Sequence, residues 1–379
     1  MPLKVAYYYY LVVTDFLLLI QDRTFILYIN GLCCYCHLTL LIRKSWVVFI
    51  YAITISIESI LIEFLTTTFL HIPPILISAI SITLAGIMLL LTAAFLMKKK
   101  GMSTLFSKSW KNLLLACLSL AVGVFTWYDS ISRIGASKEV LIAGPLEIVV
   151  IVVLAQIFLN EKLDRIQVIG IVLALMGFFI AIASDAGNVL DDSMKTDIII
   201  YSSASIIIIT FGDIEAIVSA FGFAIGVLFL TKLVSIHSSI EVAGSSMLVA
   251  GLILAGFMVV FLHDSLDISS SDGVLFPQPP PLTVTIILLI LFSLIPFIGS
   301  LCYSTGLSRI GASITATIGS SSILITVLIQ IMLKELGITS NLPENIFLAI
   351  LGGILGFLGI YVIHMHNTSY LPINIRKKQ

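Results

Sequence analysis

The sequence predicts an all-α polytopic membrane protein, in which ten transmembrane helices form two inverted five-helix repeats. The composition is the first reason: 59% of the 379 residues are hydrophobic and only 11% are charged, whereas a soluble domain carries about 25% charged residues. The second is the presence of ten apolar segments, each about as long as the 20 residues that cross a bilayer. The third is an internal repeat that relates the two halves of the chain.

Charge and cysteine content argue against several other classes of protein. The net charge of −1 gives no reason to expect nucleic acid as a partner. The five cysteines lack the paired spacing of a disulfide scaffold or a zinc site, so neither a metal nor another cofactor is predicted. The expected partners are therefore the lipid bilayer and a small-molecule substrate, with protons as a possible coupling ion.

Short polar or proline-containing segments separate several of the ten expected helices. His71-Ile72-Pro73-Pro74 separates the first two, and Lys98-Lys99-Lys100-Gly101 ends the second. The Pro/Ser-rich stretch 263–281 is expected to form an exposed loop. The predicted spans are 46–70, 75–97, 111–131, 139–159, 166–184, 212–233, 240–262, 283–306, 313–333 and 345–365.

Two other apolar stretches do not fit this pattern. Residues 1–45 hold apolar runs interrupted by charges. They make a poor signal peptide, because a basic start and a clear cleavage site are lacking. We therefore expect either one or two peripheral helices or a non-native extension. The run 198–210 has 13 residues, which is short for a span. It is expected to be an interfacial segment or an N-terminal extension of the sixth helix.

The internal repeat is a hexapeptide that occurs twice without change. Ser132-Arg133-Ile134-Gly135-Ala136-Ser137 returns 176 residues later as Ser308-Arg309-Ile310-Gly311-Ala312-Ser313. One copy follows the third expected helix and the other follows the eighth, so each repeat has five helices. Because five is odd, the second repeat must cross the membrane in the opposite direction, which predicts a pseudo-two-fold axis in the membrane plane. Alternating access is favoured over a purely architectural duplication.

The distribution of Lys and Arg predicts the orientation. With the loop before the first helix in the cytoplasm, fourteen of these residues lie in inside loops and four in outside loops. This arrangement puts the C-terminus in the cytoplasm, Arg133 outside and Arg309 inside. The glycines at 222 and 226, and at 352, 356 and 359, have the spacing of close helix contacts. Packing within the chain is preferred over a homodimer seam.

Four acids at membrane depth are the main candidates for function. A charge at the bilayer centre costs about 2.5–3.5 kcal/mol on insertion scales, so such a residue usually faces a cavity or a partner. Glu58 and Glu147 are expected to line a central cavity and to carry a coupling proton or bind a cationic group. Asp129 and Glu63 are weaker candidates. The alternative for each is a carboxyl that is hydrogen-bonded to a neighbouring helix.

Other side chains are candidates for the same substrate or proton pathway. Pro145 removes one backbone hydrogen bond near Glu147, and it either exposes carbonyls to a cavity or only shapes packing. Trp127 and Tyr303 are counterparts at the repeat offset, expected either to stack on substrate or to pack. The polar patch at Ser320, Ser321 and Ser322 either faces the cavity or serves helix packing.

Several motifs also point to a family. They include Ala143-Gly144-Pro145-Leu146-Glu147, Ile157-Phe158-Leu159-Asn160-Glu161-Lys162-Leu163, Gln167-Val168-Ile169-Gly170 and Gly212-Asp213. In order and spacing they resemble the drug/metabolite transporter superfamily, and within it the EamA-like ten-helix transporters. The resemblance implies a first repeat at 46–184, a connecting segment at 185–211, a second repeat at 212–366 and a basic tail at 367–379. Ser56-Ile57-Glu58-Ser59 stands where the family often has a Trp-Gly pair.

The predicted function is secondary transport of a small zwitterionic, cationic or neutral metabolite, amino-acid-like or drug-like, across the plasma membrane. A nucleotide-sugar or lipid-linked-sugar transporter is the alternative within the superfamily, but phosphorylated substrates should need cations at membrane depth, and the spans hold essentially none. A membrane enzyme or a channel is the alternative of another class. Asp191, Asp192 and Asp197 resemble a diphosphate-binding cluster, but no second cluster accompanies them. We therefore predict no enzymatic activity.

Overall fold

The structure is a computed structural model that describes most of the chain. The described residues are 35–69, 72–97, 109–159, 165–184, 198–202, 205–268, 282–310, 312–338, 341–343 and 345–367. Most of the N-terminal extension, the Pro/Ser-rich loop and the basic tail fall outside them. The chain divides into two compact units, Met1–Arg43 and Lys44–Gln379. The description below concerns the second unit.

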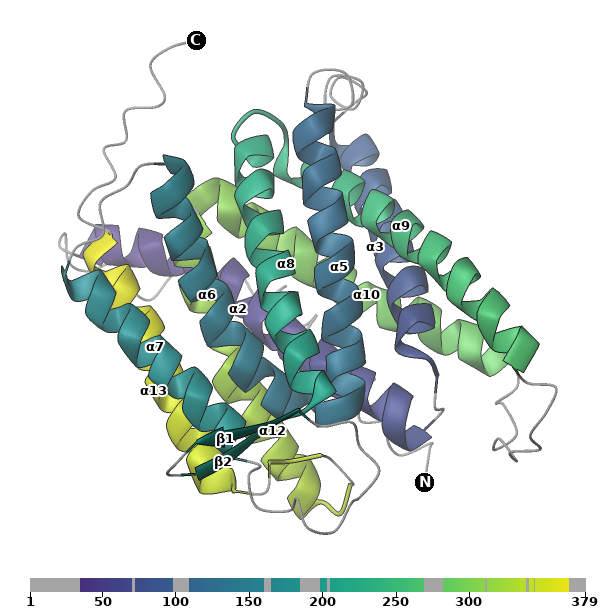
Figure 1. The fold of residues 1–379 in the computed structure, drawn as a ribbon. Coiled ribbons are helices and arrows are strands. Elements are labelled where there is room, and N and C mark those ends of the chain that lie inside the picture. The colour runs from purple at the N-terminus through teal and green to yellow at the C-terminus, as the bar shows by residue number, and fades with distance from the viewer. Residues whose placement is uncertain are drawn as a thin grey trace. The chain divides into compact units, whose positions relative to one another are not determined.

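Ten segments of the second unit correspond to the ten expected helices (Figure 1). Of the described helices, nine are long and apolar enough to cross a membrane. The remaining expected helix, the fourth in chain order, is α6, whose 24 residues rise about 36 Å, more than the roughly 30 Å of a bilayer core. The helices are α2 (Tyr35–Glu63), which continues as the π-helix η2 (Phe64–Phe69), α3 (Pro74–Met97), α5 (Trp110–Ile134), α6 (Ala136–Leu159), α7 (Arg165–Ala183), α8 (Phe211–Val234), α9 (Ser239–Ile268), α10 (Leu282–Ile310), α11 (Ala312–Gly319), α12 (Ser322–Glu335) and α13 (Ile346–Asn367).

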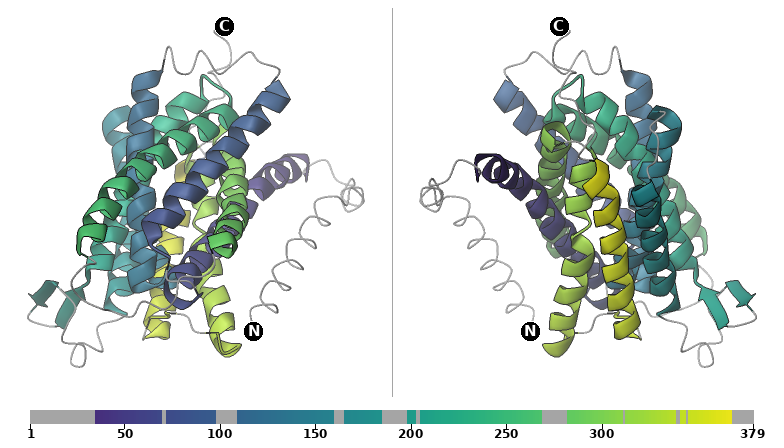
Figure 2. Two further views of the ribbon diagram at one scale, coloured as in Figure 1. Left: turned by 90° about the vertical axis from the view of Figure 1, so that its right-hand side faces the viewer. Right: turned by 90° about the vertical axis from the view of Figure 1, so that its left-hand side faces the viewer.

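The segment between the two repeats differs from the prediction. Instead of a helical extension of α8, an antiparallel hairpin is formed by β1 (Ile198–Ser202) and β2 (Ser205–Ile209) (Figure 2). The alternative, an interfacial position of this segment, stays a prediction. Its register pairs Ile198 with Ile209 and Ser202 with Ser205. The run is rich in isoleucine, whose branched side chain favours strands.

A capping box explains why α8 starts only after the hairpin. The Thr210 backbone N–H donates to the Asp213 Oδ2 atom over 2.8 Å, and the Asp213 N–H donates to the Thr210 Oγ1 atom over 3.2 Å. These reciprocal bonds satisfy amides that a helix N-terminus leaves without partners. The predicted continuation of the helix into 198–210 was therefore wrong.

Glycines let counterpart helices of the two repeats pack closely. On α7, Gly177 lies against Gly352 and Gly356 of α13, so that a Cβ atom built on Gly177 would come within 2.4 Å of the Gly356 nitrogen. In the same way Gly86 of α3 lies against the Leu248 backbone of α9. The second and seventh helices, and the fifth and tenth, are each related by the inverted repeat. The seams thus join the two halves within one chain.

The seam between α7 and α13 makes a testable prediction. We expect Gly177→Ala to lower the free energy of unfolding by about 1–3 kcal/mol, the usual cost of overpacking, because backbone atoms on α13 must move. Gly256→Ala is the matched control, since a Cβ atom there would meet nothing within 4 Å. Thermal unfolding in detergent should separate the two variants. Equal unfolding temperatures for both would contradict a tight seam.

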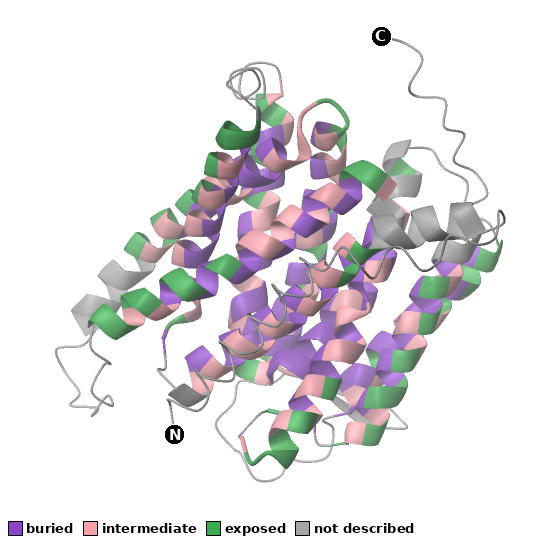
Figure 3. Ribbon diagram, turned by 180° about the vertical axis from the view of Figure 1, so that it is seen from behind, coloured by how far each residue is buried: buried purple, intermediate pink, exposed green. Residues whose placement is uncertain are grey.

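The burial pattern follows from this packing. Buried side chains lie on the faces that helices turn toward one another, and exposed apolar side chains lie on the outward faces (Figure 3). For example, Phe179 of α7 is 60% exposed and Phe347 of α13 is 76% exposed. Such apolar exposure suits a surface in contact with lipid. The buried residues include many with hydroxyl and carboxyl groups, and some of these line a cavity.

Candidate functional site

A cavity of about 190 Å³ lies between helices of both repeats. Pockets for drug-sized ligands measure about 300–1,000 Å³, so this one suits a small molecule. Five predicted pathway residues line it: Glu58, Trp127, Glu147, Tyr303 and Ser322. Three carboxyl groups point to the cavity, and its lining, within the described part of the chain, contains no Lys, Arg or His.

Glu58 of α2 accepts a hydrogen bond from a tyrosine of another helix, and that tyrosine contacts a serine of a third helix. The Tyr128 hydroxyl on α5 donates to the Glu58 Oε1 atom over 2.7 Å. The Ser81 hydroxyl on α3 lies 3.4 Å from the Tyr128 oxygen. Both Tyr128 and Ser81 are fully buried. This chain of contacts fixes the Glu58 carboxyl at the cavity wall, so the two readings of Glu58, cavity lining and hydrogen bonding to a neighbour, hold together.

Glu139 is a cavity residue that the sequence reasoning missed. The indole N–H of Trp127 donates to its Oε2 atom over 3.0 Å, and the Ser219 hydroxyl lies 3.5 Å from its Oε1 atom. Glu139 was passed over because Lys138 is its neighbour in sequence. In the structure the Lys138 Nζ atom pairs instead with the Asp213 Oδ1 atom, 2.9 Å away. The spacing of eight residues from Glu147 could have shown it, since positions about two turns apart share a helix face.

Glu147 is the cavity carboxyl with no hydrogen-bond or ion-pair partner in the part of the chain that the structure describes. Among the described residues it forms no hydrogen bond or ion pair, although it lies in the wall. Near it, the rings of Tyr51 and Tyr303 are 4.7 Å apart, and both also line the cavity. A carboxyl beside aromatic faces can attract a positively charged group. This arrangement therefore suits an organic cation better than an anion.

Pro145, one of the predicted pathway residues, does not line the cavity. Its ring packs against Gly356 of α13, since a Cβ atom on Gly356 would lie 2.8 Å from the Pro145 Cγ atom. The proline also has no N–H, so the Leu141 carbonyl loses its usual helical donor. In this structure Pro145 shapes the contact between α6 and α13, two residues before Glu147.

The serine patch marks a break in the ninth predicted helix. α11 ends at Gly319 and α12 begins at Ser322, with a turn at Ser320 and Ser321. The Ser320 and Ser321 hydroxyls donate to backbone carbonyls three residues earlier. Only Ser322 lines the cavity, and its carbonyl accepts a 3.1 Å hydrogen bond from the Ser56 hydroxyl of α2. Interrupted helices of this kind place backbone groups at substrate sites in transporters.

Comparison with known proteins decides the family. A model of the EamA-like transporter family matches the chain twice, over residues 44–183 and 210–365. The chain belongs to the EamA-like transporter family. It is thus a multi-pass membrane protein of the drug/metabolite transporter superfamily, and its membership indicates a membrane transporter. The two matched segments each contain five of the ten helices.

Other comparisons add evidence on the fold only. A search of the curated proteins finds no match to this EamA-like chain. Among solved structures, one reported as a crystal structure of a protein matches with a TM-score of 0.52 at 15% sequence identity. The match covers 86% of this chain and 98% of that one. At this identity the likeness concerns the architecture alone.

In this EamA-like protein Glu63 lies away from the cavity lining. Its carboxylate accepts the backbone N–H of Ala136 at the start of α6, over 2.8 Å, and that of Asn341, over 2.6 Å. It also accepts from the Gln330 side-chain amide of α12. The Gln330 oxygen accepts in turn from the backbone N–H and the hydroxyl of Ser137. Glu63 thus connects both repeats at one end of the molecule.

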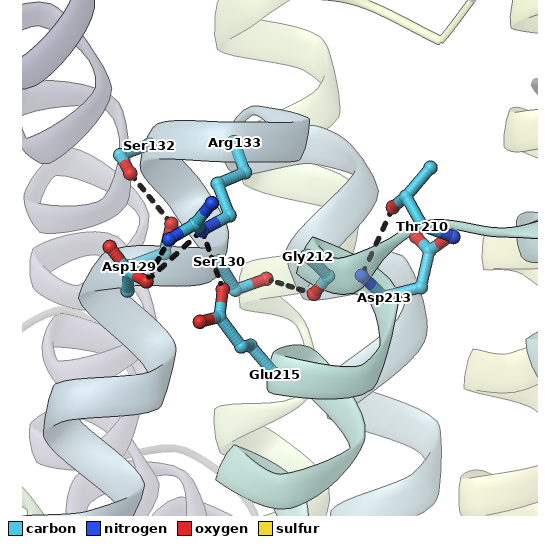
Figure 4. A network of polar contacts seen from close by, with 8 residues as sticks. All are labelled: Asp129, Ser130, Ser132, Arg133, Thr210, Gly212, Asp213 and Glu215. Atoms are coloured by element: carbon cyan, nitrogen blue, oxygen red, sulfur yellow. Dashed lines mark hydrogen bonds and ion pairs between the residues drawn. The ribbon is translucent and has the colours of Figure 1, made fainter. Parts of the chain in front are cut away.

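Asp129 belongs to a separate ionic cluster at the same end (Figure 4). Arg133, one helical turn later, donates to the Asp129 Oδ2 atom from Nε over 3.0 Å and from Nη2 over 2.8 Å. Its Nε atom also lies 3.1 Å from the Glu215 Oε2 atom of α8. The Ser130 hydroxyl donates to the Gly212 carbonyl over 2.9 Å. The structure therefore places Asp129 at the junction of α5 and α8, outside the cavity.

Proposed function

We propose that this EamA-like protein is a secondary transporter of a small organic cation or of the ammonium end of a zwitterion, working by alternating access. The observation that carries the proposal is the lining of the cavity, where Glu58, Glu139 and Glu147 meet aromatic rings and no basic side chain is present among the described residues. An anionic substrate would meet unfavourable charge there, which argues against nucleotide sugars. The family favours transport over catalysis, and we propose no enzymatic activity.

The proposal includes exchange of protons for substrate. Two of the three carboxyls receive hydrogen bonds from Tyr128 and Trp127, which stabilise their charged forms. Glu147 receives no such hydrogen bond from the described residues, so its negative charge must be neutralised either by a proton or by a substrate cation. Competition between the two at one carboxyl would couple substrate movement in one direction to proton movement in the other. We assign the exchange of protons for substrate to Glu147, and a positioning role to Glu58 and Glu139.

Transport by purified protein in proteoliposomes tests the function. We expect saturable uptake of small organic cations or amino-acid-like zwitterions, and faster uptake when the vesicle interior is acidic, because protons then leave as the substrate enters. Neutral sugars and sugar phosphates serve as comparison substrates, and protein-free liposomes as the blank. Uptake confined to sugar phosphates would overturn the proposed substrate class. Saturable flux that ignores the pH gradient would overturn proton exchange.

We further propose a plasma-membrane location with the C-terminus in the cytoplasm. The excess of basic residues in the inside loops supports this orientation. An epitope placed after Gln379 should be reached by antibody only after the membrane is permeabilised. Binding to intact cells that produce the protein at their surface would reverse the orientation.

A further inference from the structure

The first copy of the hexapeptide is held through its last two residues. In the first copy Ala136 and Ser137 are fully buried and their backbone N–H groups are bound by Glu63 and Gln330. The arginine is exposed in both copies, as Arg133 and as Arg309, so the buried part of the first copy is the end that Glu63 and Gln330 bind.

The sequences that flank the two copies differ in charge. At the offset of 176 residues, Asp129, Lys138 and Glu139 correspond to Thr305, Ile314 and Thr315. At the first copy, Lys138 pairs with Asp213 of α8, and Arg133 of the hexapeptide itself pairs with Glu215 of α8. These ion pairs join α5 and α6 to α8 at the end of the molecule that holds the first copy.

The cavity extends differently toward the two ends of the molecule. Toward the second copy its lining continues to Leu307, the residue just before Ser308, and to Val234 at the end of α8. Toward the first copy the lining ends at Trp127, Glu139 and Val140, and the hexapeptide itself takes no part. Between the cavity and that end of the molecule lie Glu63 and its partners. Moreover, Gly135 has a φ of 83°, and a Cβ atom there would come within 2.5 Å of the Asn341 carbonyl oxygen.

We propose that Glu63, Gln330 and Ser137 form the gate that closes the cavity at the end of the first hexapeptide, and that release of Glu63 opens this end while the other closes. The carboxylate holds the start of α6, the side chain of α12 and the backbone before α13 at one point. These segments come from both repeats, so they cannot separate while Glu63 keeps its partners. The inference rests on alternating access, part of the proposed function, but not on any particular substrate.

Sided labelling of one cysteine tests the gate without any substrate. In a variant whose five native cysteines are replaced by alanine, Val140→Cys places a thiol in the cavity wall next to the gate. A membrane-impermeant cationic thiosulfonate is applied to one face of oriented vesicles at a time. With Glu63 intact, we expect labelling from the face of the second hexapeptide and at least tenfold slower labelling from the face of the first. Glu63→Gln should raise the slow rate severalfold and lower the fast one.

Controls separate gating from loss of structure. Glu335→Gln removes an exposed acid on α12, at the same end, and should leave both rates unchanged. Gln330→Met keeps the side-chain volume, loses the hydrogen bonds and should act like Glu63→Gln, which provides a second test if that variant folds poorly. Faster labelling from both faces would mean a loosened fold and would overturn the gate. Unchanged rates in both gate variants would overturn it as well, whether or not transport of any substrate is detected.

Discussion

Glu147→Gln is expected to weaken substrate binding roughly 10- to 150-fold. The reason is the loss of a charged partner for the substrate cation, since a hydrogen bond to a charged group contributes about 1.5–3 kcal/mol, and 1.4 kcal/mol corresponds to a factor of ten. Folding should be unaffected, because Glu147 has no hydrogen bond or ion pair to other described residues. Equilibrium binding of a transported cation to the purified protein measures the effect.

The same variant should lose its pH dependence. In the unaltered protein the affinity for a cation should fall as the pH falls, because protons compete with the cation for the Glu147 carboxylate. An amide has no such proton, so the affinity of the variant should be flat over the same range. Glu335→Gln is the matched control. If Glu147→Gln binds the cation as tightly as the unaltered protein and keeps its pH dependence, Glu147 is not the exchange site.

The second large effect is expected from the buried ion pair between Lys138 and Asp213. Lys138→Met should lower the free energy of unfolding by about 3–5 kcal/mol, the usual cost of leaving one charge of a buried pair without its partner. Both side chains are almost fully buried, and the Lys138 Nζ atom lies 2.9 Å from the Asp213 Oδ1 atom. Thermal or denaturant unfolding in detergent gives the measurement.

A second substitution should reverse most of this loss. Asp213→Asn in the Lys138→Met background removes the remaining charge, while the side-chain oxygen of an asparagine can still accept the Thr210 N–H of the capping box. The double variant should therefore be more stable than Lys138→Met alone. Lys334→Met, at an exposed lysine of α12, should leave stability nearly unchanged. A double variant no more stable than Lys138→Met would show that the cost does not come from the unpaired aspartate.

The architecture could be predicted because local properties decide it. Runs of about 20 apolar residues must form helices in a bilayer, since each backbone polar group then finds its partner within the segment. The repeat offset and the odd number of helices per repeat then lead to inversion. The hairpin at 198–209 escaped this reasoning because it lies between spans, where neither the apolar length nor helical periodicity constrains the chain.

The site could be predicted only in part. Glu58 and Glu147 were recognisable because a carboxyl in an apolar helix implies a cavity or a partner. Asp129 met the same criterion but has Arg133 one turn later, a spacing at which side chains pair. Glu139 was missed because Lys138 is its neighbour in sequence, but the Lys138 ammonium group pairs with Asp213 of α8 and Glu139 lines the cavity.

The sequence by itself determined the membrane class, the ten helices and the inverted duplication, since these depend on composition and spacing along one segment at a time. Only the tertiary structure decided which acidic residues line the cavity and which hold helices together through hydrogen bonds or ion pairs. Glu63 is the clearest case, because its partners Gln330 and Asn341 lie 267 and 278 residues away. Such contacts depend on how helices from two repeats meet, and no periodicity within either repeat encodes that meeting.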